Sequence, residues 1–310
     1  MSSPISSITV TWKTDPYAGE IPAHVYFSTS ASQNDARPIA LIFHAGGFVL
    51  GSSAMVPKTQ ISYLASRGFV VVVPEYRLCP QVTVLEGPVQ DAKDVLQWCQ
   101  ESLPSILNEK NVQVDPKKVV AMGHSAGGML ALVTGLSPNP PQAIVDFYGC
   151  KYLADSSWSN PLPAFAQLPD PPKDFVEKVF QGPQAFTSPP MFVQGKPNLA
   201  DPRCAWYLQQ IKQGTAISSI LPDADLERAD PTSKFTKNFP PTYFLHGKAD
   251  SFVKYELTVG AHEELRTLGV ETELVVPEDL EHAFDLQPQV GDEVFEKYVV
   301  PALDFLARHV

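Results

Sequence analysis

The chain has 310 residues, of which 44% are hydrophobic and 18% are charged. This balance excludes a disordered chain, and the length suffices to bury a large core. Lys and Arg total 23 against 34 Asp and Glu, so the formal net charge is −11. A chain this acidic, without a cluster of basic residues, is a poor partner for a phosphate backbone, which argues against nucleic-acid binding.

Neither a membrane nor an oxidising compartment is indicated. The longest apolar run, residues 69–74, is far shorter than the roughly 20 residues of a membrane-spanning helix. The first residues lack the basic start and apolar stretch of a secretory signal. The cysteines are scattered without a CxxC pair, which favours buried thiols over a zinc site or a disulfide framework. We therefore expect a cytoplasmic protein that needs no metal or other cofactor.

Along the chain, short apolar runs alternate with helical patterns after an initial hairpin. Two alternating segments, 8–13 and 23–29, predict antiparallel strands at an edge. The later runs lack polar alternation, as expected of parallel strands that are buried on both faces. The predicted strands are 39–43, 69–73, 119–122, 143–148, 242–245 and 272–276, and the predicted helices are 58–67, 89–102, 128–136, 255–268 and 295–308. This order predicts an α/β fold with a mostly parallel central sheet and helices on both faces.

Residues 151–240 interrupt this alternation. They hold 13 of the 30 prolines and many large aromatic residues. Two short helices are predicted, one after Asp170-Pro171-Pro172 and one after Asp201-Pro202, each with the Asp as its cap. We interpret this region as an inserted cap over one end of the sheet. The core domain would then consist of residues 1–150 and 241–310.

The strongest chemical motif is Gly123-His124-Ser125-Ala126-Gly127, which fits the pattern G-x-S-x-G. It follows a predicted strand and precedes a helix of small and apolar residues. In that setting the serine lies on a sharp turn with its hydroxyl exposed, and small neighbours are needed because backbone approaches backbone there. Ser125 is therefore the candidate nucleophile.

A serine hydroxyl needs a base, and the base needs an orienting acid. With this type of elbow the chain order is Ser, then Asp or Glu, then His. His282 lies in a loop after the last predicted strand and is the candidate base. Asp250 follows strand 242–245 at its carboxyl end, where catalytic groups gather, and is the candidate acid. The alternatives for the acid are Glu278, Asp279, Asp146 and Asp155; of the other histidines, His262 and His309 are expected at the surface and His246 bonded to backbone.

The oxyanion that forms during acyl transfer needs fixed N–H donors. One is expected from the residue after the nucleophile, Ala126, and others from an upstream glycine loop. His44-Ala45-Gly46-Gly47-Phe48 follows a predicted strand and offers Gly46 and Gly47.

Together these motifs resemble the hormone-sensitive-lipase-like branch of the α/β-hydrolases. The resemblance runs through His44-Ala-Gly-Gly-Phe, Pro74-Glu-Tyr-Arg-Leu-Cys-Pro80, the Ser125 elbow, the segment 240–250 and Glu281-His282-Ala-Phe. It covers about residues 36–150 and 225–310. It implies an α/β-hydrolase fold with Ser125, Asp250 and His282 as the triad, Gly46, Gly47 and Ala126 as oxyanion donors, and hydrolysis of carboxylic esters without a cofactor.

The chain departs from the family pattern at three places. Ala45 replaces the first glycine of the usual His-Gly-Gly-Gly, and His124 stands where family members often carry an acidic residue. The residues before His44 read as strands and not as the usual helical cap, so the insertion 151–240 is expected to form most of the pocket roof.

The leading hypothesis is a serine esterase that cleaves a small, apolar or aromatic carboxylic ester. The same residues could hydrolyse a formamide, since the elbow is also similar to that of kynurenine formamidases, or a thioester or lactone of a biosynthetic intermediate. A receptor that binds a small ligand without turnover is the alternative outside enzymes; it predicts a broken triad, and here all three positions are filled.

Overall fold

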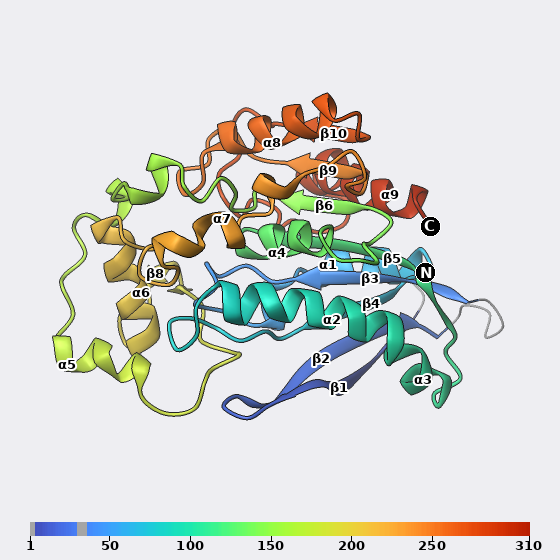
Figure 1. Ribbon diagram of the computed structural model, residues 1–310, viewed down its shortest axis with the longest axis horizontal. Coiled ribbons are helices and arrows are strands. Elements are labelled where there is room, and N and C mark those ends of the chain that lie inside the picture. The colour runs from blue at the N-terminus through green and yellow to red at the C-terminus, as the bar shows by residue number, and fades with distance from the viewer. Residues whose placement is uncertain (1–3, 30–35) are drawn as a thin grey trace.

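An eight-stranded sheet forms the centre of the molecule (Figure 1). The structure is a computed structural model that describes residues 4–29 and 36–310. The strand order is β1-β2-β4-β3-β5-β6-β9-β10. Their bounds are β1 Ile5–Asp15, β2 Gly19–Ser28, β3 Arg37–Phe43, β4 Val70–Pro74, β5 Val114–His124, β6 Ile144–Phe147, β9 Thr242–Leu245 and β10 Thr272–Val275.

The hairpin β1–β2 lies at one edge, and β2 pairs antiparallel with β4. All other pairs in this sheet are parallel. The predicted edge hairpin and the mostly parallel sheet are therefore confirmed. Because β3, β5, β6 and β9 run side by side in one direction, their carboxyl ends meet at one edge of the sheet.

Helices cover both faces of the sheet. Alternate residues of β3 separate the two apolar clusters: Leu41 packs on one side, and Ile42 on the other. The first side is covered by α2, α3, α4 and α8, and the second by α1 and α9. The helices are α1 Lys58–Ser66, α2 Gln90–Glu101, α3 Leu103–Asn108, α4 Ala126–Thr134, α5 Lys173–Val176, α6 Pro202–Gln213, α7 Leu226–Ala229, α8 Tyr255–Thr267 and α9 Val300–Arg308.

Shorter helical turns connect or extend these helices. The π-turns are Leu85–Val89 and Phe295–Val299, and the 3₁₀ turns are Ser53–Met55, Ser156–Ser159, Pro163–Phe165, Glu177–Phe180, Asp223–Asp225 and Thr232–Lys234. The π-turn Phe295–Val299 leads directly into α9, so the single helix predicted over 295–308 is divided into these two parts. The sequence pattern did not predict α3.

Residues 151–240 contain no strand of the central sheet. They carry α5, α6 and α7 and a two-stranded ribbon, β7 (Phe192–Val193) with β8 (Lys196–Pro197). In Figure 1, α5, α6 and β8 lie together beyond one end of the sheet. Residues of α6, among them Trp206 and Leu208, are buried in the main apolar cluster, together with others of this segment such as Phe165 and Ile220.

The predicted caps of the two short helices have different outcomes. The Asp201 side chain accepts hydrogen bonds from the backbone N–H of Arg203 and Cys204, each at 3.0 Å, and caps α6 as predicted. The prediction for Asp170 is wrong, because α5 begins after Pro172 without a side-chain cap. Asp170 instead pairs with Lys212 at 2.7 Å, which ties the α5 region to α6.

Two further features follow from burial and hydropathy. All four cysteines are buried and free, as predicted. Burial raises the pKa of the Cys150 thiol to about 12, so this thiol stays protonated and unreactive at neutral pH. Within residues 4–29 and 36–310, no helix combines the length and the apolar character needed to cross a membrane.

Candidate active site

Ser125 occupies the sharp turn between β5 and α4. Its backbone has φ 55° and ψ −119°, a strained conformation for a residue other than glycine, and its N–H donates to the carbonyl of Phe147 at 2.9 Å. The turn needs small neighbours: a Cβ at Gly127 would lie 2.3 Å from the carbonyl oxygen of Phe43. The Gly-x-Ser-x-Gly motif thus folds into the elbow that its pattern predicts.

The structure brings the three predicted triad residues into one hydrogen-bonded chain. His282 Nε2 lies 3.0 Å from Ser125 Oγ, and His282 Nδ1 lies 2.6 Å from Asp250 Oδ2. Both distances are within the range expected for a nucleophile, its base and the base's orienting acid. The three residues come from the elbow after β5, the loop after β9 and the loop after β10, which meet at the carboxyl edge of the sheet.

Asp250 is held as a charged acceptor. Its Oδ1 accepts hydrogen bonds from the backbone N–H of Phe252 and Val253, each at 2.8 Å. Burial alone would raise the pKa of this carboxyl, but hydrogen bonds from His246 and His282 outweigh it and hold the pKa far below its usual range. Asp250 is therefore ionised at neutral pH.

The alternative acids have other partners. Asp146 is paired with Lys151 at 2.7 Å, both fully buried. Asp155 caps a 3₁₀ turn by accepting from Ser157 N. Glu278 pairs with Lys248 at the surface. None of these carboxylates, nor Asp279, has a hydrogen bond to His282 in the part of the chain that the structure describes.

His246 has a closer relation to the site than the sequence predicted. Its Nε2 does contact backbone, the Val253 carbonyl at 3.0 Å, but it also lies 3.0 Å from Asp250 Oδ2. Its Nδ1 lies 2.6 Å from Thr258 Oγ1. The signal that could have indicated this contact is the four-residue spacing of His246 and Asp250 within one loop. His262 and His309, predicted at the surface, are half-buried, and neither lines the pocket around Ser125.

A second buried cluster connects the elbow to the histidine loop. His124 Nε2 lies 3.0 Å from Asp285 Oδ2, and Gln60 and the Tyr148 hydroxyl also donate to the Asp285 carboxylate. Burial would raise the pKa of Asp285, but the charge of His124 and these hydrogen bonds hold it below its usual value. The Tyr148 ring packs edge-on against His282 with 4.7 Å between centroids. His124, in the elbow, is thus paired with an acidic residue of the loop that carries His282.

The loop that carries the predicted oxyanion donors is a tight turn. Val49 N and Leu50 N both donate to the Gly46 carbonyl, at 3.1 and 2.9 Å. Gly46 and Gly47 have φ of 130° and 61°, and a Cβ at Gly46 would lie 1.9 Å from the Leu50 carbonyl oxygen. Among the described residues, none accepts a hydrogen bond from the backbone N–H of Gly46, Gly47 or Ala126. These three donors are free beside Ser125.

Ser125 and His282 open into a cavity of about 550 Å³. Its wall is mainly apolar and aromatic, and much of it comes from residues 151–240. The lining residues from that segment include Trp158, Leu162, Met191, Phe192, Tyr207, Ile211, Ala216 and Ile217. Further apolar lining comes from the glycine loop, with Phe48 and Leu50, and from the acid and histidine loops, with Phe252 and Leu286. Such a cavity suits a small substrate with an apolar or aromatic body.

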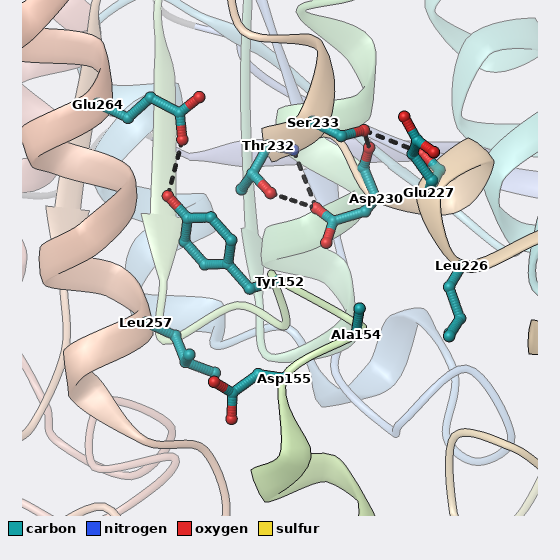
Figure 2. Close-up of a pocket in the computed structure, with 10 residues that line it drawn as sticks. All are labelled: Tyr152, Ala154, Asp155, Leu226, Glu227, Asp230, Thr232, Ser233, Leu257 and Glu264. Atoms are coloured by element: carbon teal, nitrogen blue, oxygen red, sulfur yellow. Dashed lines mark hydrogen bonds between the residues drawn. The ribbon is translucent and has the colours of Figure 1, made fainter.

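A second cavity of about 440 Å³ shares no lining residue with the first (Figure 2). Its polar groups have partners within the protein. Figure 2 shows Tyr152 donating to Glu264 at 2.8 Å and Asp230 accepting from Thr232. Asp230 also accepts from Leu153 N at 2.6 Å, so these carboxylates connect the chain after β6 to α8 and to the end of α7. Within the described ranges, no group of three or more His, Cys, Asp or Glu side chains is placed to hold a metal ion.

The known proteins that this chain resembles include two kinds: much longer synthases, of which the chain matches a small part, and a solved esterase of similar length. The chain is 31% identical over 312 residues to the non-reducing polyketide synthase ascC of Acremonium egyptiacum, and 31% identical over 313 residues to methylphloroacetophenone synthase of Cladonia uncialis. The alignments cover 93% and 88% of this chain but only 15% and 12% of those proteins. The chain thus spans a small part of the curated relatives it matches.

Among solved structures, the apo form of Thermogutta terrifontis esterase 2 superimposes with a TM-score of 0.68 at 20% identity, covering 97% of this chain and 94% of that one. The same esterase phosphorylated by paraoxon gives 0.67. At this identity the similarity shows a shared fold. The family described as alpha/beta hydrolase fold matches residues 40–286, which is most of the chain. The protein therefore belongs to the alpha/beta hydrolase family, which confirms the resemblance to its hormone-sensitive-lipase-like branch.

Proposed function

We propose that this protein is a serine hydrolase that cleaves a carboxylic ester of a small apolar or aromatic substrate. The observation that carries the proposal is the chain of contacts from Ser125 Oγ through His282 to Asp250, at 3.0 and 2.6 Å. Ser125 Oγ attacks the acyl carbon, and His282 Nε2 takes its proton. The negative charge that develops on the carbonyl oxygen is stabilised by the N–H groups of Gly46, Gly47 and Ala126.

Three further proton transfers complete the cycle. His282 returns its proton to the departing alcohol, which leaves the acyl group on Ser125 as an ester. A water molecule then gives a proton to His282 and attacks the acyl carbon, and Ser125 regains its proton as the carboxylic acid departs. Asp250 stays ionised throughout and holds His282 with Nδ1–H directed at its carboxylate, because its pKa lies far below neutral.

Residues 151–240 act as the cap in this proposal. They supply about half of the apolar wall of the cavity, so the proposed division into a core of 1–150 and 241–310 and an inserted cap is also a division of tasks. The core holds the reacting groups, and the cap selects the acyl group or the alcohol. A cytoplasmic location suits a reaction that needs only water as co-substrate.

A second candidate is hydrolysis of a thioester or lactone of a polyketide. It is favoured by the similarity to non-reducing polyketide synthases over 88–93% of this chain. Hydrolysis of a thioester by the same residues differs only in the leaving group, a thiolate in place of an alkoxide. In formamide hydrolysis the departing nitrogen must be protonated before the C–N bond breaks. Apart from the similarity of the elbow motif, no observation favours this reaction.

The test combines turnover with covalent labelling. Wild type, Ser125→Ala and Ser157→Ala are assayed with p-nitrophenyl acetate, butyrate and octanoate and with a fluorophosphonate probe. Ser157 lines the same cavity but has no histidine bonded to it, so it is the matched control. We expect Ser125→Ala to lose turnover by a factor of at least 10³ and all labelling, and Ser157→Ala to keep both.

The results of labelling and turnover together also distinguish the possible reaction classes. Labelling that persists in Ser125→Ala would contradict the assignment of the nucleophile. A wild type that is labelled but inactive on the esters is then assayed with aromatic acyl thioesters of N-acetylcysteamine and with N-formylkynurenine. A preference for the thioester would support the second candidate, and a preference for the formamide would reject both. A wild type that is neither labelled nor active would favour a ligand receptor.

A further inference from the structure

Tyr207 brings a hydroxyl group close to the glycine loop of the proposed oxyanion site. It lies on α6, in the segment 151–240, and its side chain lines the same cavity as Ser125 and Gly47. A Cβ built on Gly47 would lie 2.0 Å from the Tyr207 hydroxyl oxygen. The hydroxyl thus occupies the space directly beside the Gly47 backbone, whose N–H is free.

The ring of Tyr207 is buried, while its hydroxyl reaches the cavity. Tyr207 is only 7% exposed, and its hydroxyl makes no hydrogen bond to any residue within 4–29 and 36–310. A buried phenol normally satisfies its O–H, because an unpaired donor costs stability. Two other buried tyrosines make such a bond: Tyr148 donates to Asp285, and Tyr76 donates to the His44 carbonyl at 2.9 Å. Tyr243 is also buried and has no hydroxyl partner among the described residues, but it does not line this cavity. The Tyr207 hydroxyl differs because it lies beside Gly47 in the cavity, where a bound ligand can accept its hydrogen bond.

We infer that the Tyr207 hydroxyl is a fourth hydrogen-bond donor to the carbonyl oxygen of the substrate, alongside the N–H groups of Gly46, Gly47 and Ala126. The inference rests on the proposed function, since it concerns the oxyanion of the same reaction. No proton is transferred: the O–H shortens its contact with the oxygen as negative charge develops there, and Tyr207 stays protonated. Burial raises the pKa of Tyr207 well above its ordinary value, which keeps the phenol neutral and able to donate.

This assignment makes α6 part of the reacting site as well as of its wall. The three backbone donors come from the core, whereas Tyr207 comes from the proposed cap. The oxyanion site would therefore be complete only when α6 packs against the Gly46–Gly47 loop. Because the phenol adds a donor chiefly as charge develops on the oxygen, its removal should affect kcat more than KM.

The experiment compares Tyr207→Phe with wild type and with Tyr152→Phe. Tyr152 lies in the second cavity and donates to Glu264, so it is a matched loss of one hydroxyl away from Ser125. With p-nitrophenyl butyrate we expect Tyr207→Phe to lower kcat about 10²-fold while KM changes less than twofold. Inhibition by an aryl trifluoromethyl ketone, which forms a charged adduct with the nucleophile, should weaken by a similar factor. Tyr152→Phe should keep kcat.

Stability separates this role from a structural one. Since the Tyr207 hydroxyl bonds to no described residue, its removal should leave the midpoint of urea unfolding unchanged or raised. A lower midpoint with unchanged kcat would overturn the inference, as would a raised KM at constant kcat, which would mean contact with the ground state of the substrate only. In both cases an active wild type keeps the proposed function. A wild type that is inactive and unlabelled would overturn both.

Discussion

At the scale of single residues, the acid of the triad is supported by a buried network that fixes the proton positions. Lys151 Nζ only donates, and it lies 2.8 Å from Thr258 Oγ1. The hydroxyl of Thr258 therefore directs its own proton to His246 Nδ1, at 2.6 Å. His246 must carry its proton on Nε2, where it faces two acceptors, Asp250 and the Val253 carbonyl. The network thus presents a neutral histidine donor to Asp250.

We predict that His246 positions Asp250 through this hydrogen bond. His246→Leu removes the donor, which raises the pKa of Asp250 and lets the carboxylate rotate away from His282. The expected result is a loss in kcat of about tenfold with little change in KM, since a hydrogen bond to a charged group is worth about 1.5–3 kcal/mol and two backbone donors remain. Steady-state kinetics with p-nitrophenyl butyrate measures it.

His246→Gln and His262→Leu are the controls for that prediction. Glutamine can return an N–H to the position of Nε2 and should restore most of the kcat, which a purely structural role would not require. His262, on the adjacent α8, contacts Thr272 and not the site, so His262→Leu should keep kcat. Equal losses in the Leu and Gln variants at position 246 would argue against positioning.

These residues also mark how far a sequence can predict a site. Ser125, Asp250 and His282 could be predicted because the elbow pattern and the chain order constrain them. Two other contacts could not be predicted, that of His246 with Asp250 and that of His124 with Asp285. Both depend on how loops from separate strands close over the sheet edge. Tyr207 was unpredictable for the same reason: nothing near it in the sequence marks its distance from Gly47.

At the scale of elements, burial made the core predictable. The predicted strand 242–245 has the bounds of β9, and most predicted helices agree with the observed ones within two residues. The strand predicted over 119–122 is longer, because β5 begins at Val114 and includes the polar residues Lys117 and Lys118. Their side chains are more exposed than the rest of the strand, so an apolar run could not reveal them.

The two predicted Asp caps allow a matched test of what a helix cap contributes to stability. Asp201 accepts from two N–H groups at the start of α6, whereas Asp170 caps nothing and makes only an exposed ion pair with Lys212. We predict that Asp201→Ala lowers the free energy of unfolding by about 1 kcal/mol, the usual cost of a lost N-cap. Asp170→Ala should have no measurable effect.

Urea unfolding of both variants measures the difference, and turnover adds a second readout. Because α6 carries Tyr207 and the cavity residue Ile211, fraying of its first turn should also reduce turnover. An Asp170→Ala variant as unstable as Asp201→Ala would show that the ion pair, and not the cap, holds this part of the chain.

At the scale of the whole molecule, the reaction site and the cavity have different origins. Elbow, acid and base are set by the parallel strands, whose carboxyl ends meet whatever covers them. Nearly half of the residues that line the cavity come from 151–240, where α5 and α7 are short and many residues are irregular. The sequence therefore predicted which residues meet at the sheet edge more closely than the shape of the cavity, because packing among proline-rich loops has no periodic signal.

This division predicts that substitutions of lining residues in 151–240 other than Tyr207 change substrate preference without disabling the triad. Ala216 is half-buried and lines the cavity, whereas Ser218, two residues along, is exposed outside it. A tryptophan at position 216 would fill part of the 550 Å³ space. We expect Ala216→Trp to lower kcat/KM for the longest accepted p-nitrophenyl ester by about tenfold or more relative to the acetate, because each excluded methylene forfeits burial in an apolar pocket.

Ser218→Trp adds the same ring outside the cavity and should leave the ratio of kcat/KM values unchanged. Acetate turnover and fluorophosphonate labelling of Ser125 should persist in Ala216→Trp, because neither needs the far end of the cavity. A proportional loss for every ester would mean that position 216 affects the reacting groups themselves. In that case the residues of 151–240 would be part of the catalytic framework, and substrate size would be decided elsewhere along the wall.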